Sequence, residues 1–257
     1  MEKKDEFLLS NLYINKVSIT RKIPIGNYLK ELPVVKNLMQ TDGIRFHKPV
    51  TFLVGENGVG KSTLIEAMAV ACGFNPEGGT INFNFSTRSS HSDLYNYLTI
   101  SRGYKKHRDG FFLREESFYN VASNIENMDD GVSLGAPVIS SYGGVSLHKQ
   151  SHGESFMSLV ENRFGGNGLY ILDEPEAALS PMRMMRLLCY MQQLVNNNSQ
   201  FVISTHSPIL MTFPNAELLE ITEDGINSVD YKETEHFLIT KRFMDTPEKM
   251  IARLLDI

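Results

Sequence analysis

The stretch Gly55-Glu-Asn-Gly-Val-Gly-Lys-Ser-Thr63 decides the fold of this chain. It fits the pattern G-x-x-x-x-G-K-[ST] without a mismatch. Its three glycines let the backbone curl, so that the N–H groups point inward at phosphate oxygens. The apolar run PVTFLV at 49–54 precedes it, and a helical pattern over 61–72 follows it and stops at Gly73. The sequence therefore predicts a strand, a phosphate-binding loop and a helix, in that order.

The loop and the helix after it define the first part of a candidate site for ATP and Mg²⁺. We expect the Lys61 ammonium to reach the outer phosphates and the Ser62 hydroxyl to ligate Mg²⁺. The positive N-terminal end of the helix adds to the attraction for an anion. A glycine turn with an incidental lysine is the alternative. The expected nucleotide-binding residues are Gly55, Glu56, Asn57, Gly58, Val59, Gly60, Lys61, Ser62 and Thr63.

Two carboxylates stand at the end of a second apolar run, Leu169-Tyr-Ile-Leu-Asp-Glu174. Ligands bind at the carboxyl ends of strands in open α/β sheets, so these acids are expected beside the phosphate loop. Neighbouring side chains of a strand point in opposite directions, which predicts different roles for them. Asp173 is expected to hold Mg²⁺, and Glu174 is expected to act as the general base on water. A strand that ends in two solvated acids is the alternative.

A capping box precedes another helix, because Ser151 and Glu154 are spaced as N-cap and N3 residues. A well-capped helix N-terminus is also a site that anions use. Ser151 and Gly153 are therefore expected to contribute to a second phosphate contact. His206 follows the apolar run FVIST and lies close before Pro208, which places it in a loop at the ligand edge of the sheet. There it is expected to bind a γ-phosphate or to orient water; a structural histidine is the alternative.

Composition excludes some classes of protein. The chain has 257 residues, with 25 basic and 30 acidic side chains and a net charge of −5, which argues against a bulk basic surface for nucleic acid. The N-terminus lacks the apolar core of a signal peptide, and no apolar stretch is long enough for an integral membrane segment. We therefore expect a cytoplasmic protein. Cys72 and Cys189 lie in apolar helical contexts and are expected to be buried free thiols.

Strands and helices alternate along much of the chain, which predicts an α/β fold with a mostly parallel core sheet. The middle of the chain, about 84–165, lacks that alternation and is expected to form an inserted lobe of one domain whose core is 1–83 and 166–257. Further strands are expected at 8–19, 80–86, 94–101, 111–114 and 201–204, helices at 115–128, 154–164 and 182–195, a loop at 131–150, and a hairpin at 217–231 before two final helices.

The order of these elements resembles the ATP-binding-cassette (ABC) ATPases over about 50–210. The resemblance implies ATP hydrolysis with Mg²⁺ and a homodimer that closes over two ATP molecules. It makes Ser151–Glu154 the signature motif, with His152 where the family has its first glycine and Glu154 where it has glutamine. Ala177–Ser180 resembles the loop through which two subunits touch. Glu115 or Glu116 stands where the family places a strand-end glutamine.

Asp173-Glu-Pro-Glu176 and Thr205-His-Ser-Pro208 resemble the branch of Rad50, RecF and chromosome-maintenance ATPases. The inserted segment is too short for a long coiled-coil arm, which predicts a compact member of that branch. One hypothesis is an ATP-driven switch that acts on a client such as nucleic acid, a toxin-like protein or a defence effector. The alternative is the motor subunit of a transporter. A non-hydrolysing ATP-binding module is a third possibility, against which Glu174 argues.

Overall fold

The computed structural model describes residues 11–81, 92–114, 118–129 and 138–255. Its centre is a six-stranded sheet in which neighbours pair in parallel, except for an antiparallel hairpin at one edge. This confirms the expected α/β class with a mostly parallel core. In spatial order the strands are β5 (Asp109–Arg114), β6 (Gly168–Asp173), β7 (Gln200–Ser204), β3 (Val50–Val54), β8 (Glu217–Ile221) and β9 (Ile226–Ser228).

The central strands are near-continuous apolar runs because both faces of the sheet are covered. Every residue of β3, β6 and β7 is buried, as expected for parallel strands under two layers of helices. Alternate side chains enter opposite layers: Phe52 joins the core on one face and Leu53 the core on the other. The register aligns Asp173 with Ser204, so β6 and β7 end side by side.

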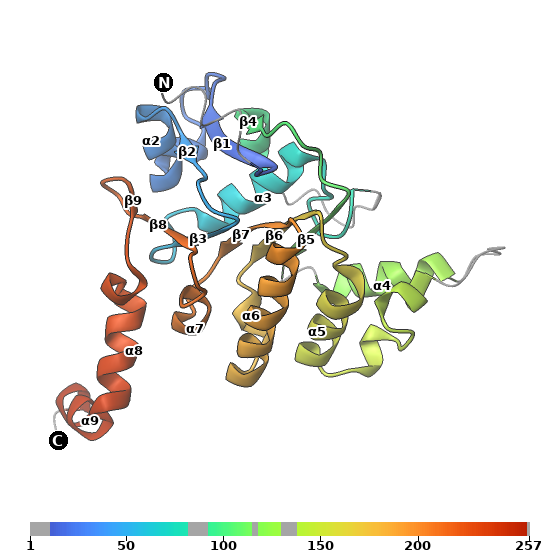
Figure 1. Cartoon of the computed structure of the whole chain (residues 1–257). Coiled ribbons are helices and arrows are strands. Elements are labelled where there is room, and N and C mark those ends of the chain that lie inside the picture. Colours follow the sequence, from blue (N-terminus) through green and yellow to red (C-terminus); the bar gives the residue numbers. More distant parts are fainter. Residues whose placement is uncertain (1–10, 82–91, 115–117, 130–137, 256–257) are drawn as a thin grey trace.

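One face of the sheet carries helix α3 and a small antiparallel sheet (Figure 1). The small sheet has the order β2-β1-β4. Neither β2 nor the helical turn and helix between β1 and β2 was predicted from the sequence. The elements of this layer are β1 (Ile14–Ile19), the 3₁₀ turn Tyr28–Glu31, α2 (Pro33–Gln40), β2 (Ile44–Arg45), α3 (Lys61–Cys72), the 3₁₀ turn Asp93–Asn96 and β4 (Leu98–Arg102).

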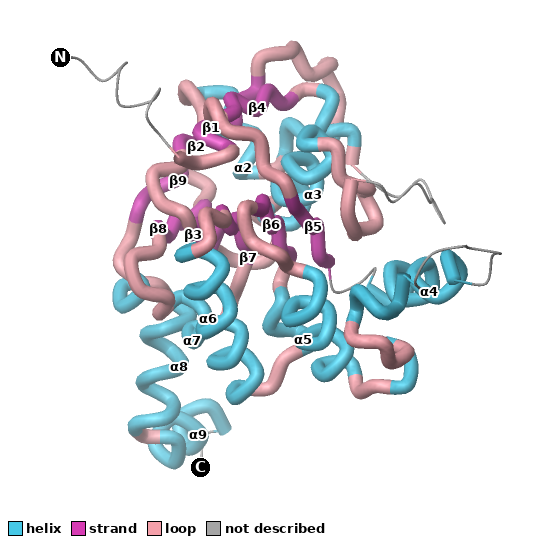
Figure 2. Tube along the Cα trace, turned by 45° about the vertical axis from the view of Figure 1, so that its right-hand side comes forward, coloured by secondary structure: helices cyan, strands magenta, loops and turns pink. Residues whose placement is uncertain are grey.

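Helices cover the opposite face of the sheet (Figure 2). The sequence predicted most of them within a few residues, although the short helix after β7 was not predicted. The helices of this layer are α4 (Phe118–Asp129), α5 (His152–Arg163), α6 (Pro181–Asn196) and α7 (Pro208–Met211), with 3₁₀ turns at Val138–Tyr142 and Leu147–Lys149.

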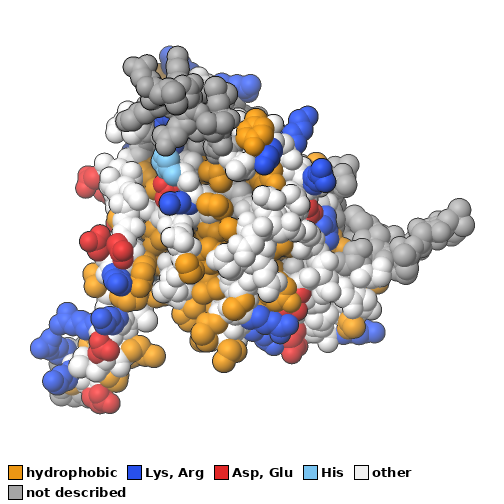
Figure 3. All heavy atoms as spheres, in the orientation of Figure 1, with side chains coloured by type: hydrophobic (Ala, Val, Ile, Leu, Met, Phe, Trp, Pro, Cys, Tyr) orange, Lys and Arg blue, Asp and Glu red, His pale blue; other side chains and the backbone are white. Residues whose placement is uncertain are grey.

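After the β8–β9 hairpin, a 3₁₀ turn (Tyr231–Glu233) leads into α8 (Glu235–Asp245) and α9 (Pro247–Leu255), which confirms the two final helices. They extend away from the sheet in Figure 1, and Figure 3 shows both signs of charge on their surface. Across the part of the chain that the structure describes, each helix is too short or too polar to cross a bilayer.

A buried glutamine side chain joins the small sheet to the central sheet. Gln200 Oε1 accepts hydrogen bonds from the backbone N–H groups of Tyr13 (2.8 Å) and Ile14 (2.9 Å). Its Nε2 donates to the Ile14 carbonyl at 2.9 Å. The amide of Gln200 thus satisfies three backbone groups at the start of β1, which fixes that strand to the edge of the sheet where β7 begins.

Some expected strands differ from the structure. Residues 94–101 divide into a 3₁₀ turn, Asp93–Asn96, and β4, because the Ser92 hydroxyl caps the turn by accepting from the Leu94 N–H. Thr80 and Ile81 are not in a strand, and residues 82–86 lie outside the described residues. β1 begins at Ile14, because residues 11–13 are not in a strand, and residues 8–10 of the expected strand lie outside the described residues.

The segment expected to form the inserted lobe, about 84–165, contributes two strands to the sheets. β4 pairs with β1, and β5 pairs in parallel with β6. The helices of that segment, α4 and α5, begin only after β5. A strand over Phe111–Arg114 was expected from the sequence, but its pairing with β6 joins residues more than fifty positions apart.

The two cysteines are in different environments. Cys72 is buried, and burial raises the pKa of its thiol to about 12. Cys189 is exposed, so the expectation of a second buried thiol was wrong. The buried side of α6 is formed by Met184, Leu187, Met191 and Leu194. Cys189 lies five residues after Met184, on the opposite side of the helix.

Candidate functional site

The phosphate loop runs from the end of β3 to the start of α3, as predicted. Gly55, Gly58 and Gly60 all have positive φ. At Gly55 a Cβ would lie 2.3 Å from the Ile221 carbonyl oxygen, so glycine is also required by the close approach of β8. Gly60 precedes α3 without a side-chain cap. The first N–H groups of α3 therefore remain available to an anion.

Lys61 is buried within the loop that it follows. Its Nζ donates to the carbonyl oxygens of Gly55 (2.9 Å) and Glu56 (2.8 Å). Burial lowers the pKa of Lys61, and the carboxylates of Glu174, Asp173 and Glu176 oppose that shift. The ammonium is thus held against the inner side of the loop by weak, neutral acceptors. A phosphate group is a stronger acceptor for the same donor.

Asp173 ends β6 as a buried carboxylate beside the loop. The Ser204 hydroxyl donates to its Oδ1 at 2.5 Å, and Arg114 Nε lies 3.6 Å from its Oδ2. Burial raises the pKa of Asp173, while the hydrogen bond from Ser204, the charge of Arg114 and a hydrogen bond from Ser62 oppose that change. The contact with Ser62 joins the end of β6 to the first turn of α3.

The pair formed by Ser62 and Asp173 fits Mg²⁺. Both present hard oxygen ligands, and they already share a hydrogen bond. Within the described ranges no cluster of three or more His, Cys, Asp or Glu side chains is arranged to hold a metal ion. This agrees with Mg²⁺, which usually takes one or two protein ligands together with phosphate oxygens and water instead of an all-protein cage.

Glu174 differs from Asp173 in backbone and environment. Its φ is +47°, a left-handed conformation that is uncommon outside glycine and asparagine. The Glu174 N–H lies 3.1 Å from both the carbonyl oxygen and the hydroxyl of Ser204. This turn sends the side chain away from Asp173, and 39% of it is exposed. The two neighbouring acids thus face different surroundings, as expected, but the left-handed turn at Glu174 separates them and not the alternation of a strand, because β6 ends at Asp173.

His206 lies opposite Glu174, just beyond the end of β7. Its Nε2 is 3.4 Å from Glu174 Oε1, and its Nδ1 is 2.9 Å from Nε2 of His236. The backbone N–H of His206 donates to Glu176 Oε1 at 2.5 Å. Burial, the charge of Lys61 and the neighbouring His236 lower the pKa of His206 to about 4. The imidazole is therefore neutral at physiological pH.

The helix expected to carry the signature motif begins as predicted, with Ser151 as N-cap and a capping box to Glu154. The Glu154 carboxylate accepts from the Ser151 N–H (3.0 Å) and hydroxyl (2.6 Å) and pairs with Arg183 (3.2 Å). A Cβ on Gly153 would lie 2.7 Å from the Ala178 carbonyl oxygen, so α5 begins in close contact with the loop before α6. That loop, 175–180, includes the residues expected to touch a second subunit.

α5 and α3 pack in different layers. The residues of α3 join the core on the face of the small sheet, and those of α5 join the core on the opposite face. The structure therefore brings Lys61, Ser62, Asp173, Glu174 and His206 to one edge of the sheet, and it holds Ser151 and Gly153 on a separate helix.

Two protein-family models match the chain. One, described as an "AAA domain", matches residues 35–133, and the other, "AAA domain, putative AbiEii toxin, Type IV TA system", matches residues 156–212. The first contains the phosphate loop and the second contains the Asp173–Glu174 strand end and His206. The chain carries a P-loop ATPase domain of the AAA type, and its fold is similar to that of ABC ATPases.

The ATPase also resembles individual proteins. It is 35% identical over 75 residues to the "Retron Vc95 probable ATPase" of Vibrio cholerae serotype O1 biovar El Tor, a match that spans 28% of this chain and 13% of that protein. Its fold is similar to the structure of cbiO1 from Clostridium perfringens, part of the ABC transporter complex cbiONQ. That match has a TM-score of 0.50 and 18% identity, and covers 96% of this chain and 100% of the other. The SMC head domain from Thermotoga maritima matches with a TM-score of 0.43 and 15% identity over 85% of this chain and 99% of the other.

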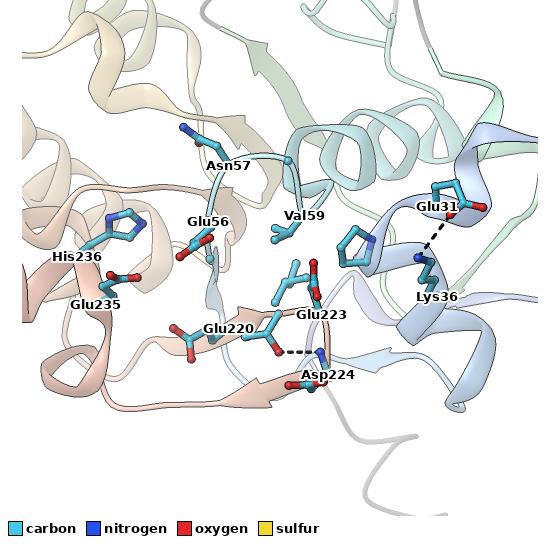
Figure 4. A pocket seen from close by; sticks show the side chains of 15 residues that line it. Glu31, Lys36, Glu56, Asn57, Val59, Glu220, Glu223, Asp224, Glu235 and His236 are labelled. Atoms are coloured by element: carbon cyan, nitrogen blue, oxygen red, sulfur yellow. Dashed lines mark hydrogen bonds and ion pairs between the residues drawn. The ribbon is translucent and has the colours of Figure 1, made fainter.

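A pocket of about 730 Å³ lies along the phosphate loop of the ATPase (Figure 4). Glu56, Asn57 and Val59 line it from the loop, while the β8–β9 turn, α2 and the start of α8 complete its wall. It adjoins the side of β3 where β8 pairs, whereas Asp173 and Glu174 end β6 on the side of β7. The pocket is therefore adjacent to the acids and does not contain them.

The sequence analysis missed several residues of the site. Arg114 ends β5, forms an ion pair with Glu66 of α3 and lies beside Asp173. Ser204 ends β7 and holds Asp173 and Glu174 together. The sequence placed Arg114 at the end of a predicted strand, after the run FFL, and this position at the ligand edge of the sheet could have marked it as a site residue. Glu115 and Glu116, the candidates for the family's glutamine, lie outside the described residues.

Proposed function

We propose that the ATPase binds Mg²⁺-ATP at its phosphate loop and closes, as a dimer of two copies, over two ATP molecules to switch a client. The convergence of Lys61, Ser62, Asp173, Glu174 and His206 at one edge of the sheet supports the proposal most strongly. Charge that develops on a transferring phosphoryl group is stabilised by such positioned donors and cations.

In this mechanism Lys61 leaves the two loop carbonyls and donates to the β- and γ-phosphates. Glu174 accepts a proton from the water whose oxygen attacks the γ-phosphorus, while the bond from that phosphorus to the bridging oxygen of ADP breaks. His206 donates an N–H to a γ-phosphate oxygen. Ser62 and Asp173 would hold Mg²⁺, which when bound neutralises phosphate charge.

Ser151 and Gly153 act in trans in this proposal. Their helix belongs to the layer opposite α3, which suits a contact with the γ-phosphate bound by a second copy. To make that contact, the Ser151 hydroxyl leaves the Glu154 carboxylate, to which it donates in the free protein. ADP lacks the γ-phosphate and does not hold the dimer.

The test mixes two inactive variants. Lys61→Ala cannot bind ATP productively, and Ser151→Arg removes the contact of its own helix with the γ-phosphate of the other copy, while its monomer still binds ATP. A mixed dimer contains one composite site with both residues intact, so ATP hydrolysis is expected to return when the two are combined. As a control, Lys61→Ala is mixed with Ser140→Arg, which places the same substitution at an exposed serine away from the site and shows how much activity the dilution of an active protein leaves. If the first mixture stays inactive, the two-copy site is wrong.

From the toxin and retron systems to which the matched proteins belong, we infer a protein client over nucleic acid. The match over 156–212 is to a domain described with a toxin system, and the curated relative is a retron ATPase. The net charge of −5 also disfavours a broad nucleic-acid surface. A Glu174→Gln variant with ATP, used to trap the closed state, is expected to retain a protein client in a pull-down. Retention of nucleic acid instead would reverse this assignment.

A further inference from the structure

His206 has two different neighbours on its two ring nitrogens. Nε2 faces the Glu174 carboxylate at 3.4 Å, and Nδ1 faces Nε2 of His236 at 2.9 Å. The two imidazole rings are nearly perpendicular, at 89°, with their centroids 4.7 Å apart. His236 comes from α8, which follows the core sheet in the sequence, and the sequence analysis gave it no role.

The neighbours determine which nitrogen carries hydrogen. A neutral imidazole has one N–H and one lone pair. A lone pair on Nε2 would face the negative carboxylate of Glu174, which is repulsive, so the hydrogen belongs on Nε2. Nδ1 is then an acceptor, and a donor must come from His236. With that assignment both contacts of the His206 ring are favourable.

We propose that His236 is a positioning residue for His206. Its Nε2–H donates to Nδ1 of His206 and holds the ring in the tautomer that presents Nε2–H to the reacting phosphate. This inference rests on the proposed function of His206 in hydrolysis. It also makes the first turn of α8 a part of the catalytic arrangement.

The first turn of α8 is fixed well enough for this role. Thr234, the residue before α8, is 1% exposed, and its hydroxyl donates to the Tyr231 carbonyl at 2.7 Å. The same hydroxyl lies 3.7 Å from the sulfur of Met211 in α7. The rings of Tyr231 and Phe237 pack edge to face at 5.1 Å. His236 is therefore held between a buried anchor and an aromatic contact.

The test compares His236→Leu with His236→Gln in the full chain. Leucine removes the donor, whereas the side-chain amide of glutamine can donate from a similar position. We expect His236→Leu to lower kcat by about tenfold, the usual scale for one lost hydrogen bond, with KM for ATP within about twofold. His236→Gln should recover most of the rate. His47→Leu, at an exposed histidine that also pairs with a carboxylate, serves as the matched control and should leave kcat unchanged.

A spectroscopic measurement separates positioning from a structural role. In ¹⁵N-labelled protein without nucleotide, His206 should show a protonated Nε2 and an unprotonated Nδ1, and His236→Leu should shift population toward the other tautomer. An unchanged tautomer, a wild-type kcat in His236→Leu, or an equal loss in His236→Gln would each overturn the proposal. The tautomer of His206 is measured without ATP, so this test does not depend on the proposed function. Failure of the proposed function would show separately, as unchanged hydrolysis in His206→Ala.

Discussion

Replacing Gln200 with methionine tests how the small sheet is fixed to the central sheet. Methionine has a similar volume and leaves little cavity, but it cannot bond to the backbone of β1. Two N–H groups, at Tyr13 and Ile14, and the Ile14 carbonyl lose their partner. All three groups belong to residues that are buried, so water does not readily replace the amide.

The expected cost follows from these three groups. A buried polar group left without a partner costs about 1–3 kcal/mol, so three groups at the lower value give about 3 kcal/mol. For a chain of this size, each kcal/mol corresponds to about 2–4 °C, so the melting temperature should fall by about 6–12 °C. Amide exchange at Tyr13 and Ile14 should accelerate as well.

The assay is urea and thermal unfolding of the full chain, with Gln193→Met as control. Gln193 is exposed on α6 and has a similar helix propensity to methionine, so its replacement should change stability by less than about 0.5 kcal/mol. If Gln200→Met loses no more stability than this control, the bonds to β1 do not hold the two sheets together.

Three further changes test other parts of the account. Lys61→Ala should abolish ATP binding in a titration with a fluorescent ATP analogue while the fold survives; near-normal affinity would refute the loop assignment. Gly153→Ala should destabilise the protein in thermal unfolding, although alanine favours helix by about 1 kcal/mol, because its Cβ would lie 2.7 Å from the Ala178 carbonyl oxygen; a gain in stability would contradict that contact. In urea unfolding, Asp109→Asn should reduce the loss of unfolding free energy that the wild-type protein shows as the pH falls between about 5 and 2. If the variant loses as much stability on acidification as the wild type, Asp109 is not the source of that loss.

The sign of the Asp109 effect follows from its surroundings. Burial opposes ionisation, but hydrogen bonds from the Gly165 N–H and the Tyr170 hydroxyl and the charge of Arg163 lower its pKa below the ordinary 3.8. A carboxylate with a lowered pKa in the folded state stabilises the protein above its unfolded pKa. That stabilisation is lost as the pH falls through the folded pKa.

Local patterns predicted the parts of the site that follow directly from a strand end or a helix start. The glycines of the loop, the apolar run before Asp173 and the spacing of Ser151 and Glu154 are short-range signals, and each element lies where the sequence placed it. Parallel pairing of β3, β6 and β7 then brings their carboxyl ends to one edge without further information.

Contacts between distant residues were not predictable in this way. Gln200 bonds to Ile14 across 186 positions, and His236 meets His206 from a helix with no pattern that points to the site. Arg114 reaches both Glu66 and Asp173, although nothing in its strand marks those partners. A single polar side chain carries no periodicity, so its partner depends on how the elements pack. The left-handed backbone of Glu174 is likewise set by its bonds to Ser204.

Sedimentation of the Glu174→Gln variant tests the central claim most directly. Glutamine keeps the shape of the side chain but cannot accept the proton of water, so bound ATP persists. The account predicts a dimer with Mg²⁺-ATP and a monomer with Mg²⁺-ADP, and a monomer again when Ser151→Arg is added to the variant. A Glu174→Gln protein that binds ATP at saturation and still sediments as a monomer would contradict the two-copy site.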